Sequence, residues 1–297
     1  MTSHAETPVS RCIRAMGLHR WLAVLVMVGL AGCGGGPLGD RLDSALATGQ
    51  AQGMQPQWLD SGPFTLLAQI RIQAPGQPLR LYIEGDGFAW ITRTRPSPDP
   101  TPHRPVALWL ATRDPAPNVA WLARPCQYSM LARPGTVCDR SYWTHARMAP
   151  TVIEAVDAAV TALRKQAGAT AVELVGYSGG GGIAAILTAR RGDVVALRTV
   201  AGNLDSGAFV RHHRVSPMTG SIDAVTEAAR TRSVPQIHFV GEHDRTVPPF
   251  LADTFIRRAG SAAVKVVVPG LDHARGWNTA WPELLQHPLP DVTKASP

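Results

Sequence analysis

Residues 173–187 of the chain read ELVGYSGGGGIAAIL, a strand-like run, a serine flanked by glycines and an apolar, helix-like run. The centre of the stretch is the pattern G-x-S-x-G, formed by Gly176, Ser178 and Gly180. Glycines at these positions permit a strained serine backbone and a close approach of the neighbouring strand and helix. Such a turn lifts the serine hydroxyl clear of a sheet and points the amides of a helix N-terminus at a developing anion. The stretch predicts that Ser178 is a nucleophile. A plain glycine-rich turn remains an alternative, and a phosphate-binding loop would need a lysine that this stretch lacks.

The chain around this stretch alternates strand-like and helix-like runs from about residue 63 onward. Late strand-like runs such as 237–240 and 264–268 are expected to be buried on both faces, which is typical of a parallel sheet covered by helices. The pattern predicts one α/β domain without internal repeats. Strands are expected at 64–72, 79–83, 118–122, 171–175, 194–200, 236–240 and 263–268, and helices at 106–112, 148–165, 181–190, 222–230 and 249–258.

The G-x-S-x-G turn in its strand and helix context resembles the nucleophile elbow of the α/β-hydrolase superfamily. The resemblance covers about residues 64–285. It implies a single mostly parallel sheet with helices on both faces and at most a small flap, for which 207–221 is the candidate. It also implies acyl transfer without a metal or an organic cofactor, with a carboxylesterase acting on a small or medium ester as the favoured activity. Peptidase, thioesterase and acyltransferase activities use the same residues, and a non-catalytic binding module on the same fold is the alternative of a different class.

A serine nucleophile needs a base to take its proton and an acid to orient that base. The segment GEHDRTVP at 241–248 resembles the family's acid loop and assigns the acid to Asp244, whereas GLDH at 270–273 follows the last strand and assigns the base to His273. Glu242 and Asp205 are the alternative acids. The pair His212 and His213 is interpreted as structural or substrate-facing.

The expected oxyanion loop departs from the family pattern. Many lipases and esterases have His-Gly-Gly-Gly after an early strand, whereas this chain has Glu84-Gly85-Asp86-Gly87. Because backbone amides hold the oxyanion, the missing histidine need not abolish the function. We expect the donors to be the amide of Gly179 and that of Gly85 or Asp86. A simple hairpin turn at Asp86-Gly87 is the alternative.

The N-terminus has the features of an export signal. Arg11, Arg14 and Arg20 precede an apolar run at 21–32, which is too short for a membrane-spanning helix. The run ends in Leu30-Ala31-Gly32-Cys33, which resembles the lipobox of bacterial lipoproteins. We therefore expect a signal peptide at 1–32, a lipid-anchored Cys33 and a flexible tether at 33–62, followed by the hydrolase domain at 63–297. A core helix with a chance cysteine is the alternative.

The resemblance to lipoproteins implies a location in the bacterial cell envelope, facing the periplasm. Gly34 follows the lipidated cysteine where an aspartate would favour the inner membrane, so the outer membrane is favoured. Together with the EGDG loop, the lipobox and the segment RPCQY at 124–128 resemble uncharacterised bacterial hydrolase lipoproteins.

The four cysteines agree with export. Cys12 would leave with the signal peptide and Cys33 would be acylated, so Cys126 and Cys138 remain as one pair. Disulfides persist in the periplasm, and a metal site would need further ligands at fixed spacing. The sequence predicts a disulfide between Cys126 and Cys138.

Composition and charge exclude other classes of protein. The chain of 297 residues is 45% hydrophobic and 17% charged, which is too apolar for a disordered chain. Its formal net charge is +7, but the cations are mostly arginines scattered along the chain rather than gathered in a run. We therefore expect no nucleic-acid partner.

Overall fold

The computed structural model describes residues 39–132 and 138–292. The predicted signal peptide and Cys33 lie outside these residues. From Arg41 onward the described chain forms one compact unit. None of the helices within the two described ranges has the length and apolar composition needed to span a membrane.

The described strands form one sheet in the order β1-β2-β4-β3-β5-β6-β7-β8. β2 pairs antiparallel with both β1 and β4, whereas the remaining neighbours pair in parallel. The predicted mostly parallel sheet is thereby confirmed. The strands are β1 (Gln55–Ser61), β2 (Phe64–Ile72), β3 (Leu79–Ile83), β4 (Asn118–Leu122), β5 (Val172–Tyr177), β6 (Val194–Val200), β7 (Gln236–Gly241) and β8 (Ala263–Val268).

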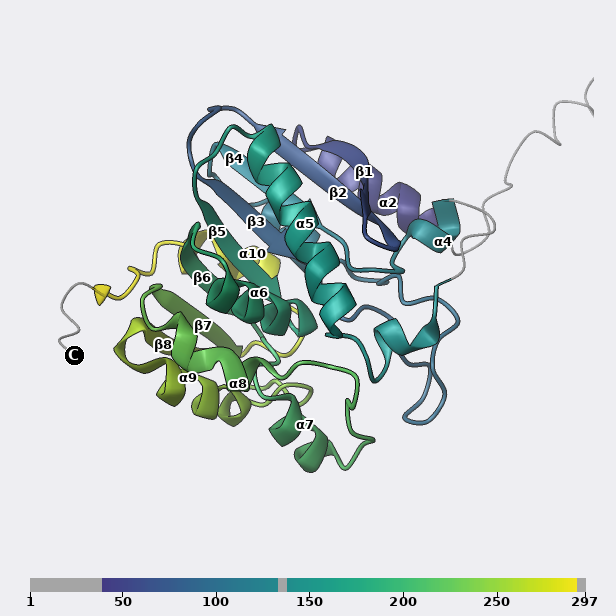
Figure 1. The fold of residues 1–297 in the computed structure, drawn as a ribbon, viewed down its shortest axis with the longest axis vertical. Helices are drawn as coiled ribbons and strands as arrows, with labels where there is room; N and C mark the ends of the chain where they lie inside the picture. Colours follow the sequence, from purple (N-terminus) through teal and green to yellow (C-terminus); the bar gives the residue numbers. More distant parts are fainter. Residues whose placement is uncertain (1–38, 133–137, 293–297) are drawn as a thin grey trace, which may run out of the picture. The chain divides into compact units, whose positions relative to one another are not determined.

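Helices cover both faces of this sheet, as Figure 1 shows. Residues of α5, α6, α8 and α9 join one hydrophobic core, and residues of α2, α3 and α10 join a second core on the opposite face. The α-helices are α2 (Gly39–Gln50), α3 (Val106–Ala111), α4 (Ser129–Ala132), α5 (Pro150–Gln166), α6 (Gly179–Arg190), α7 (Ser206–His213), α8 (Ala224–Glu227), α9 (Asp253–Ala259) and α10 (Trp277–Leu284).

The central strand β5 shows why the sequence forms this layer. Leu174 points into the core with α5 and α6, and its neighbour Val175 points into the core with α3 and α10. Successive side chains of a strand point to opposite faces of the sheet. A strand with apolar side chains on both faces is therefore stable only between two layers of helices. All seven strands that the sequence predicts occur within two residues of their expected bounds.

The predicted flexible tether is wrong for residues 39–62. These residues form α2 and β1, and β1 extends the sheet by pairing with β2. The small residues of α2 serve close packing: Ala45 is buried, and a Cβ at Gly49 would lie 1.9 Å from Oε1 of Gln69. The same Gln69 donates from Nε2 to the carbonyl oxygen of Ala45 over 2.8 Å. Small and polar residues, which are also common in linkers, thus form a helix here, because they let α2 pack closely against β2.

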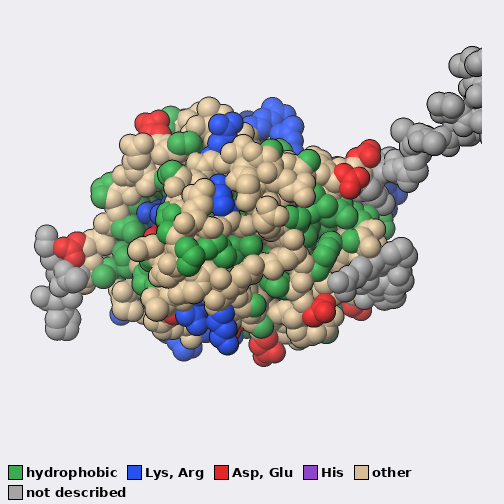
Figure 2. All heavy atoms as spheres, turned by 90° about the horizontal axis from the view of Figure 1, so that it is seen from above, with side chains coloured by type: hydrophobic (Ala, Val, Ile, Leu, Met, Phe, Trp, Pro, Cys, Tyr) green, Lys and Arg blue, Asp and Glu red, His purple; other side chains and the backbone are tan. Residues whose placement is uncertain are grey.

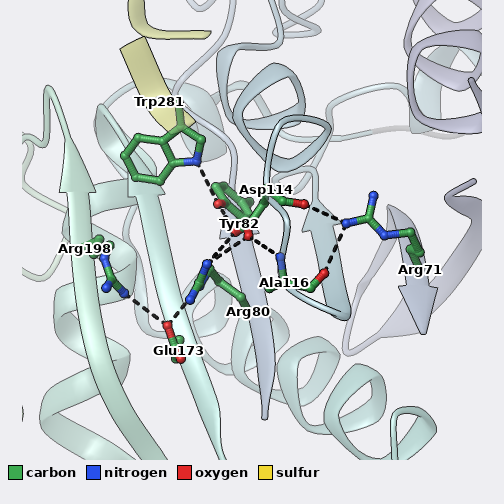
Figure 3. A network of polar contacts seen from close by, with 8 residues as sticks. All are labelled: Arg71, Arg80, Tyr82, Asp114, Ala116, Glu173, Arg198 and Trp281. Atoms are coloured by element: carbon green, nitrogen blue, oxygen red, sulfur yellow. Dashed lines mark hydrogen bonds and ion pairs between the residues drawn. The ribbon is translucent and has the colours of Figure 1, made fainter. Parts of the chain in front are cut away.

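A polar network fixes α10 to the second face of the sheet (Figure 3). Trp281 of α10 donates from Nε1 to the hydroxyl of Tyr82 over 2.9 Å, and this hydroxyl donates to Asp114. Arg80 pairs with Asp114 over 2.8 Å and with Glu173 over 2.9 Å. Burial and the adjacent Asp114 raise the pKa of Tyr82 well above its usual value, so the hydroxyl stays a donor. The network therefore anchors α10, the helix that follows β8 in the chain, to strand β3.

A disulfide joins Cys126 to Cys138, with 5.7 Å between their Cα atoms. This confirms the pairing that the cysteine count predicts. Residues 133–137, within the closed loop, lie outside the described ranges.

The basic side chains do not gather into one region on the face that Figure 2 shows. Lysine and arginine side chains of the described residues form separate groups there, with uncharged and hydrophobic atoms between them. A nucleic-acid-binding surface presents its cations along a continuous stripe or patch. The cations on this face are dispersed and do not form such a stripe.

His238 makes the stability of the fold dependent on pH. It is completely buried in β7, where its Nδ1 lies 2.9 Å from Oγ1 of Thr199 and its Nε2 lies 3.2 Å from Oε1 of Gln236. Burial lowers its pKa to about 3. Because the unfolded histidine binds a proton near pH 6.5 and the folded one does not, stability is lost as the pH falls from about 6.5 towards 3.

We expect the free energy of unfolding to fall by about 2 kcal/mol more between pH 7 and pH 5 in the wild type than in His238→Gln. Urea denaturation at the two pH values measures this difference. Comparing the two falls removes the contribution of other titrating groups and of any general loss of stability in the variant. Equal falls would contradict the assignment to His238.

Candidate active site

Ser178 occupies a strained turn between β5 and α6. Its backbone has φ of 51° and ψ of −119°, in a region that non-glycine residues rarely adopt. The glycines around it have no room for side chains: a Cβ at Gly176 would lie 2.4 Å from the carbonyl oxygen of Gly180, and one at Gly180 would lie 2.3 Å from that of Ile83. The turn therefore holds the hydroxyl at the carboxyl edge of the parallel strands.

Three side chains from separate loops form one hydrogen-bonded chain at this edge. Nε2 of His273 lies 3.1 Å from Oγ of Ser178, and Nδ1 of His273 lies 2.8 Å from Oδ2 of Asp244. The other carboxylate oxygen of Asp244 accepts from the amides of Thr246 and Val247 over 2.8 and 2.7 Å. Because the buried carboxylate accepts, Nδ1 of His273 carries the proton and Nε2 is free to accept the proton of the serine.

Hydrogen bonds to its backbone also hold His273 in place. Its carbonyl oxygen accepts from the hydroxyl of Tyr177 and from Nε1 of Trp277, each over 3.1 Å. Trp277 begins α10, the helix that the Tyr82 network fixes to the sheet. The imidazole is thus oriented by contacts on both its ring and its backbone.

The alternative acids lie elsewhere. Glu242 is exposed and accepts from the amide of Gly270 over 2.9 Å. Asp205 accepts from the amide of Ala208 over 2.7 Å and caps α7. Within residues 39–132 and 138–292, the carboxylate that contacts His273 is that of Asp244.

The two adjacent histidines lie at the end of α7. Nε2 of His213 contacts the carbonyl oxygen of Thr246 over 2.8 Å, and the ring of His212 packs edge-on against Phe250. Neither joins the hydrogen-bonded chain of Ser178.

The Glu84–Gly87 loop lies directly beside the serine. A Cβ at Gly85 would lie 3.3 Å from Cβ of Ser178. The amide of Gly85 donates to Oε1 of Glu84 over 2.9 Å, which leaves it unfit as an oxyanion donor. The amide of Asp86 makes no hydrogen bond with another described residue, and Gly179 is the first residue of α6, where helical amides lack intrahelical partners. Of the predicted donors, Gly179 and Asp86 therefore remain, and Gly85 does not.

Glu84 stands where the family pattern has histidine and has a structural role. Its side chain is completely buried and accepts from Nε1 of Trp121 over 3.0 Å and from the amides of Ala107 and Leu108 over 3.4 Å. Burial raises its pKa. Glu84 thereby ties the loop to α3 and β4.

Two arginines that the sequence analysis did not assign to the site clamp Asp86. Arg124 donates to one carboxylate oxygen of Asp86, and Arg147 donates to the other over 2.5 Å. Arg124 also donates to the carbonyl oxygen of Arg147. Burial opposes ionisation of Asp86, but Arg147 and Arg124 outweigh it and lower its pKa to about 2. Only the RPCQY segment hinted at Arg124, and no local pattern marks Arg147.

A cavity of about 440 Å³ opens over Ser178 and His273. Its walls come from the segment 84–106, from Arg147, from Phe209 of α7 and from Thr246. α7 overlaps the region 207–221 that was expected to form a small flap, and no larger cap occurs among the residues that the structure describes. Likewise, no cluster of three or more histidine, cysteine or acidic residues suited to a metal occurs in these ranges.

The backbone resembles solved serine hydrolases and esterases. Est1E from Butyrivibrio proteoclasticus aligns with a TM-score of 0.54 and 14% identity, over 77% of this chain and 97% of that one. A serine hydrolase without a lid from Xanthomonas campestris aligns with a TM-score of 0.51 and 14% identity, over 82% of this chain and 97% of that one. A puromycin-hydrolyzing peptidase from Mycobacterium tuberculosis aligns with a TM-score of 0.54 and 15% identity, over 79% of this chain and 38% of the peptidase. No family model and no curated protein matches the chain in sequence.

Proposed function

We propose that this chain, which has the α/β-hydrolase fold, is a serine hydrolase that transfers acyl groups from carboxylic esters to water. The observation that carries the proposal is the hydrogen-bonded chain from Ser178 through His273 to Asp244, at the mouth of a cavity. A binding module has no need of a serine held in a strained backbone with a base aligned to its hydroxyl.

The proposed reaction has two halves. His273 takes the proton of Ser178 as its oxygen attacks the ester carbonyl, and Asp244 stabilises the imidazolium that forms. The amides of Gly179 and Asp86 would hold the negative oxygen of the tetrahedral intermediate. His273 then gives its proton to the leaving alcohol, and a water activated by His273 releases the acid from Ser178.

Esters are favoured as substrates because a further solved structure, the esterase domain of a Rhodothermus marinus protein, aligns with a TM-score of 0.52 and 15% identity over 94% of its own length. The puromycin-hydrolyzing peptidase is covered only to 38%, so its remaining chain has no counterpart here. Peptidase activity is therefore the weaker candidate.

A fluorophosphonate probe tests the proposed function. We expect the purified protein to react with one equivalent and the adduct to map to the peptide that contains Ser178, because the probe reacts with serines that a base activates. Heat-denatured protein is the control and should stay unlabelled. Folded protein that takes up no probe would favour the non-catalytic module.

We also propose that the protein is lipid-anchored in the bacterial envelope through Cys33. The support is the order of Arg11, Arg14 and Arg20, the apolar run at 21–32 and Cys33. Two or more acyl chains give stable anchoring where one chain would be marginal.

For the anchor, we expect labelled palmitate to enter the wild-type protein in bacterial cells and not Cys33→Ser. Cys12→Ser is the matched control and should keep the label. Incorporation that survives Cys33→Ser would refute the anchor at this position.

A further inference from the structure

A second cavity of about 600 Å³ adjoins the one over Ser178. The two cavities share Trp90, Arg147, Phe209 and Thr246 as lining residues, so a substrate held at Ser178 can extend from one into the other. The walls of the second cavity come from segments 90–94 and 213–218, with Arg147 at the junction. None of these segments takes part in the proposed chemistry.

The lining of the second cavity has one sign of charge. Arg93, Arg147, Arg214 and Arg245 line it, and no Asp or Glu does so among the described residues. We call it the arginine cavity. Cavities lined by one sign of charge concentrate ligands of the opposite sign.

At the junction between the two cavities, Arg147 belongs to a pair of buried arginines that share one carboxylate. Arg124 and Arg147 are both at least nine-tenths buried, and they share the single carboxylate of Asp86. Glu84, the other carboxylate that lines the first cavity, accepts from Trp121 and backbone amides instead. Buried charges are costly unless they are paired, and here one carboxylate is hydrogen-bonded to two guanidinium groups.

Arg147 is placed to contact an anionic group. Its Nε donates to the carbonyl oxygen of Thr144 over 2.7 Å and its Nη1 to Asp86 over 2.5 Å. Its Nη2 makes no hydrogen bond with another described residue, although the residue lines both cavities. A guanidinium held by two bonds with a donor left over suits a carboxylate or phosphate oxygen.

We infer that the ester substrate carries an anionic oxygen group, a carboxylate or a phosphate, which lies in the arginine cavity while its carbonyl lies at Ser178. The inference rests on the proposed function and adds the substrate class to it. Arg147 is the first contact of the anion, and the exposed Arg93, Arg214 and Arg245 surround its outer side. An apolar linker between the anionic group and the ester carbonyl would pass Trp90 and Phe209.

Matched esters test the inference. Mono-4-nitrophenyl adipate and suberate carry a terminal carboxylate, and 4-nitrophenyl hexanoate and octanoate are their neutral counterparts with the same leaving group. For an anion on the alcohol side, 4-carboxyphenyl and 4-phosphonooxyphenyl acetate are compared with 4-methylphenyl acetate, each relative to its rate with hydroxide. We expect kcat/KM to favour the anionic member of at least one set by about tenfold or more.

Variants locate the preference. Arg147→Gln should reduce the ratio of anionic to neutral kcat/KM by about tenfold or more, and Arg214→Gln and Arg245→Gln by smaller factors. Because Arg147 also holds Asp86, the ratio is the readout and not the absolute rate. Arg257→Gln removes an exposed arginine of α9 that lines neither cavity and should leave the ratio unchanged.

The outcomes separate the two proposals. Neutral esters hydrolysed as fast as anionic ones in every set would overturn the inference and leave the serine hydrolase intact. A preference that is the same in the wild type, Arg147→Gln and Arg245→Gln would also overturn it. Absence of hydrolysis of every ester, together with no fluorophosphonate adduct, would overturn both.

Discussion

Replacing Ser178 with alanine is expected to lower kcat for ester hydrolysis by about 10⁶-fold, because the variant lacks the hydroxyl that forms the acyl intermediate in the proposed reaction. The fold should be retained, since the alanine loses only a hydroxyl whose partner is His273. Initial rates with 4-nitrophenyl hexanoate measure the loss. The fluorophosphonate adduct should disappear with the activity.

Ser206→Ala is the matched control for this variant. Ser206 is buried at the start of α7, and its hydroxyl has no hydrogen-bond partner among the described residues. Removing that hydroxyl should leave kcat within a factor of two or so, as for substitutions away from special contacts. Activity that persists in Ser178→Ala at more than a trace would place the nucleophile elsewhere.

Replacing Asp244 with asparagine is expected to lower kcat by about 10⁴-fold through the tautomer of His273. The asparagine oxygen would still accept hydrogen bonds from the amides of Thr246 and Val247, which donate to Oδ1 of Asp244 in the wild type. Its NH₂ group would then face Nδ1 of His273 and force the ring proton onto Nε2. A protonated Nε2 cannot accept the proton of Ser178, so attack on the ester would stall. Steady-state kinetics at pH 8 measures the loss.

Glu242→Gln distinguishes the two acids of the same loop. Glu242 is exposed, and its carboxylate accepts from the amide of Gly270 rather than from His273. We expect this variant to keep nearly full kcat. If Glu242→Gln lost as much activity as Asp244→Asn, Asp244 would not be the specific orienting acid.

Several features were predictable because their signals are local. Strand β7, for example, is marked by the closely spaced apolar residues Ile237, Phe239 and Val240, and the turn at Ser178 is marked by glycines only a few residues away. Asp244 and His273 were predictable because their loops resemble those of the α/β-hydrolase pattern. The structure places both loops after parallel strands, which end at a common edge.

Other features depend on contacts between distant residues. α2 was missed because its small residues, which resemble those of a linker, pack against Gln69 of β2. From the sequence, the amides of Gly85 and Asp86 are equal candidates for the second oxyanion donor. The structure excludes Gly85, because its amide donates to the Glu84 carboxylate. Hydrogen bonding of this kind cannot be inferred from residue type alone.

The sequence by itself determined the α/β layers and the strained serine turn, because periodicity and glycine patterns act within a few residues, and the resemblance of two later loops to the α/β-hydrolase pattern indicated the two partners of the serine. Only the tertiary structure decided what the substrate would meet beyond Ser178. Asp86, Arg124 and Arg147 come from three separate loops, and a shared carboxylate brings them together. The physical reason is that a buried charge is stabilised by whichever partner the fold places against it, whatever its distance along the chain.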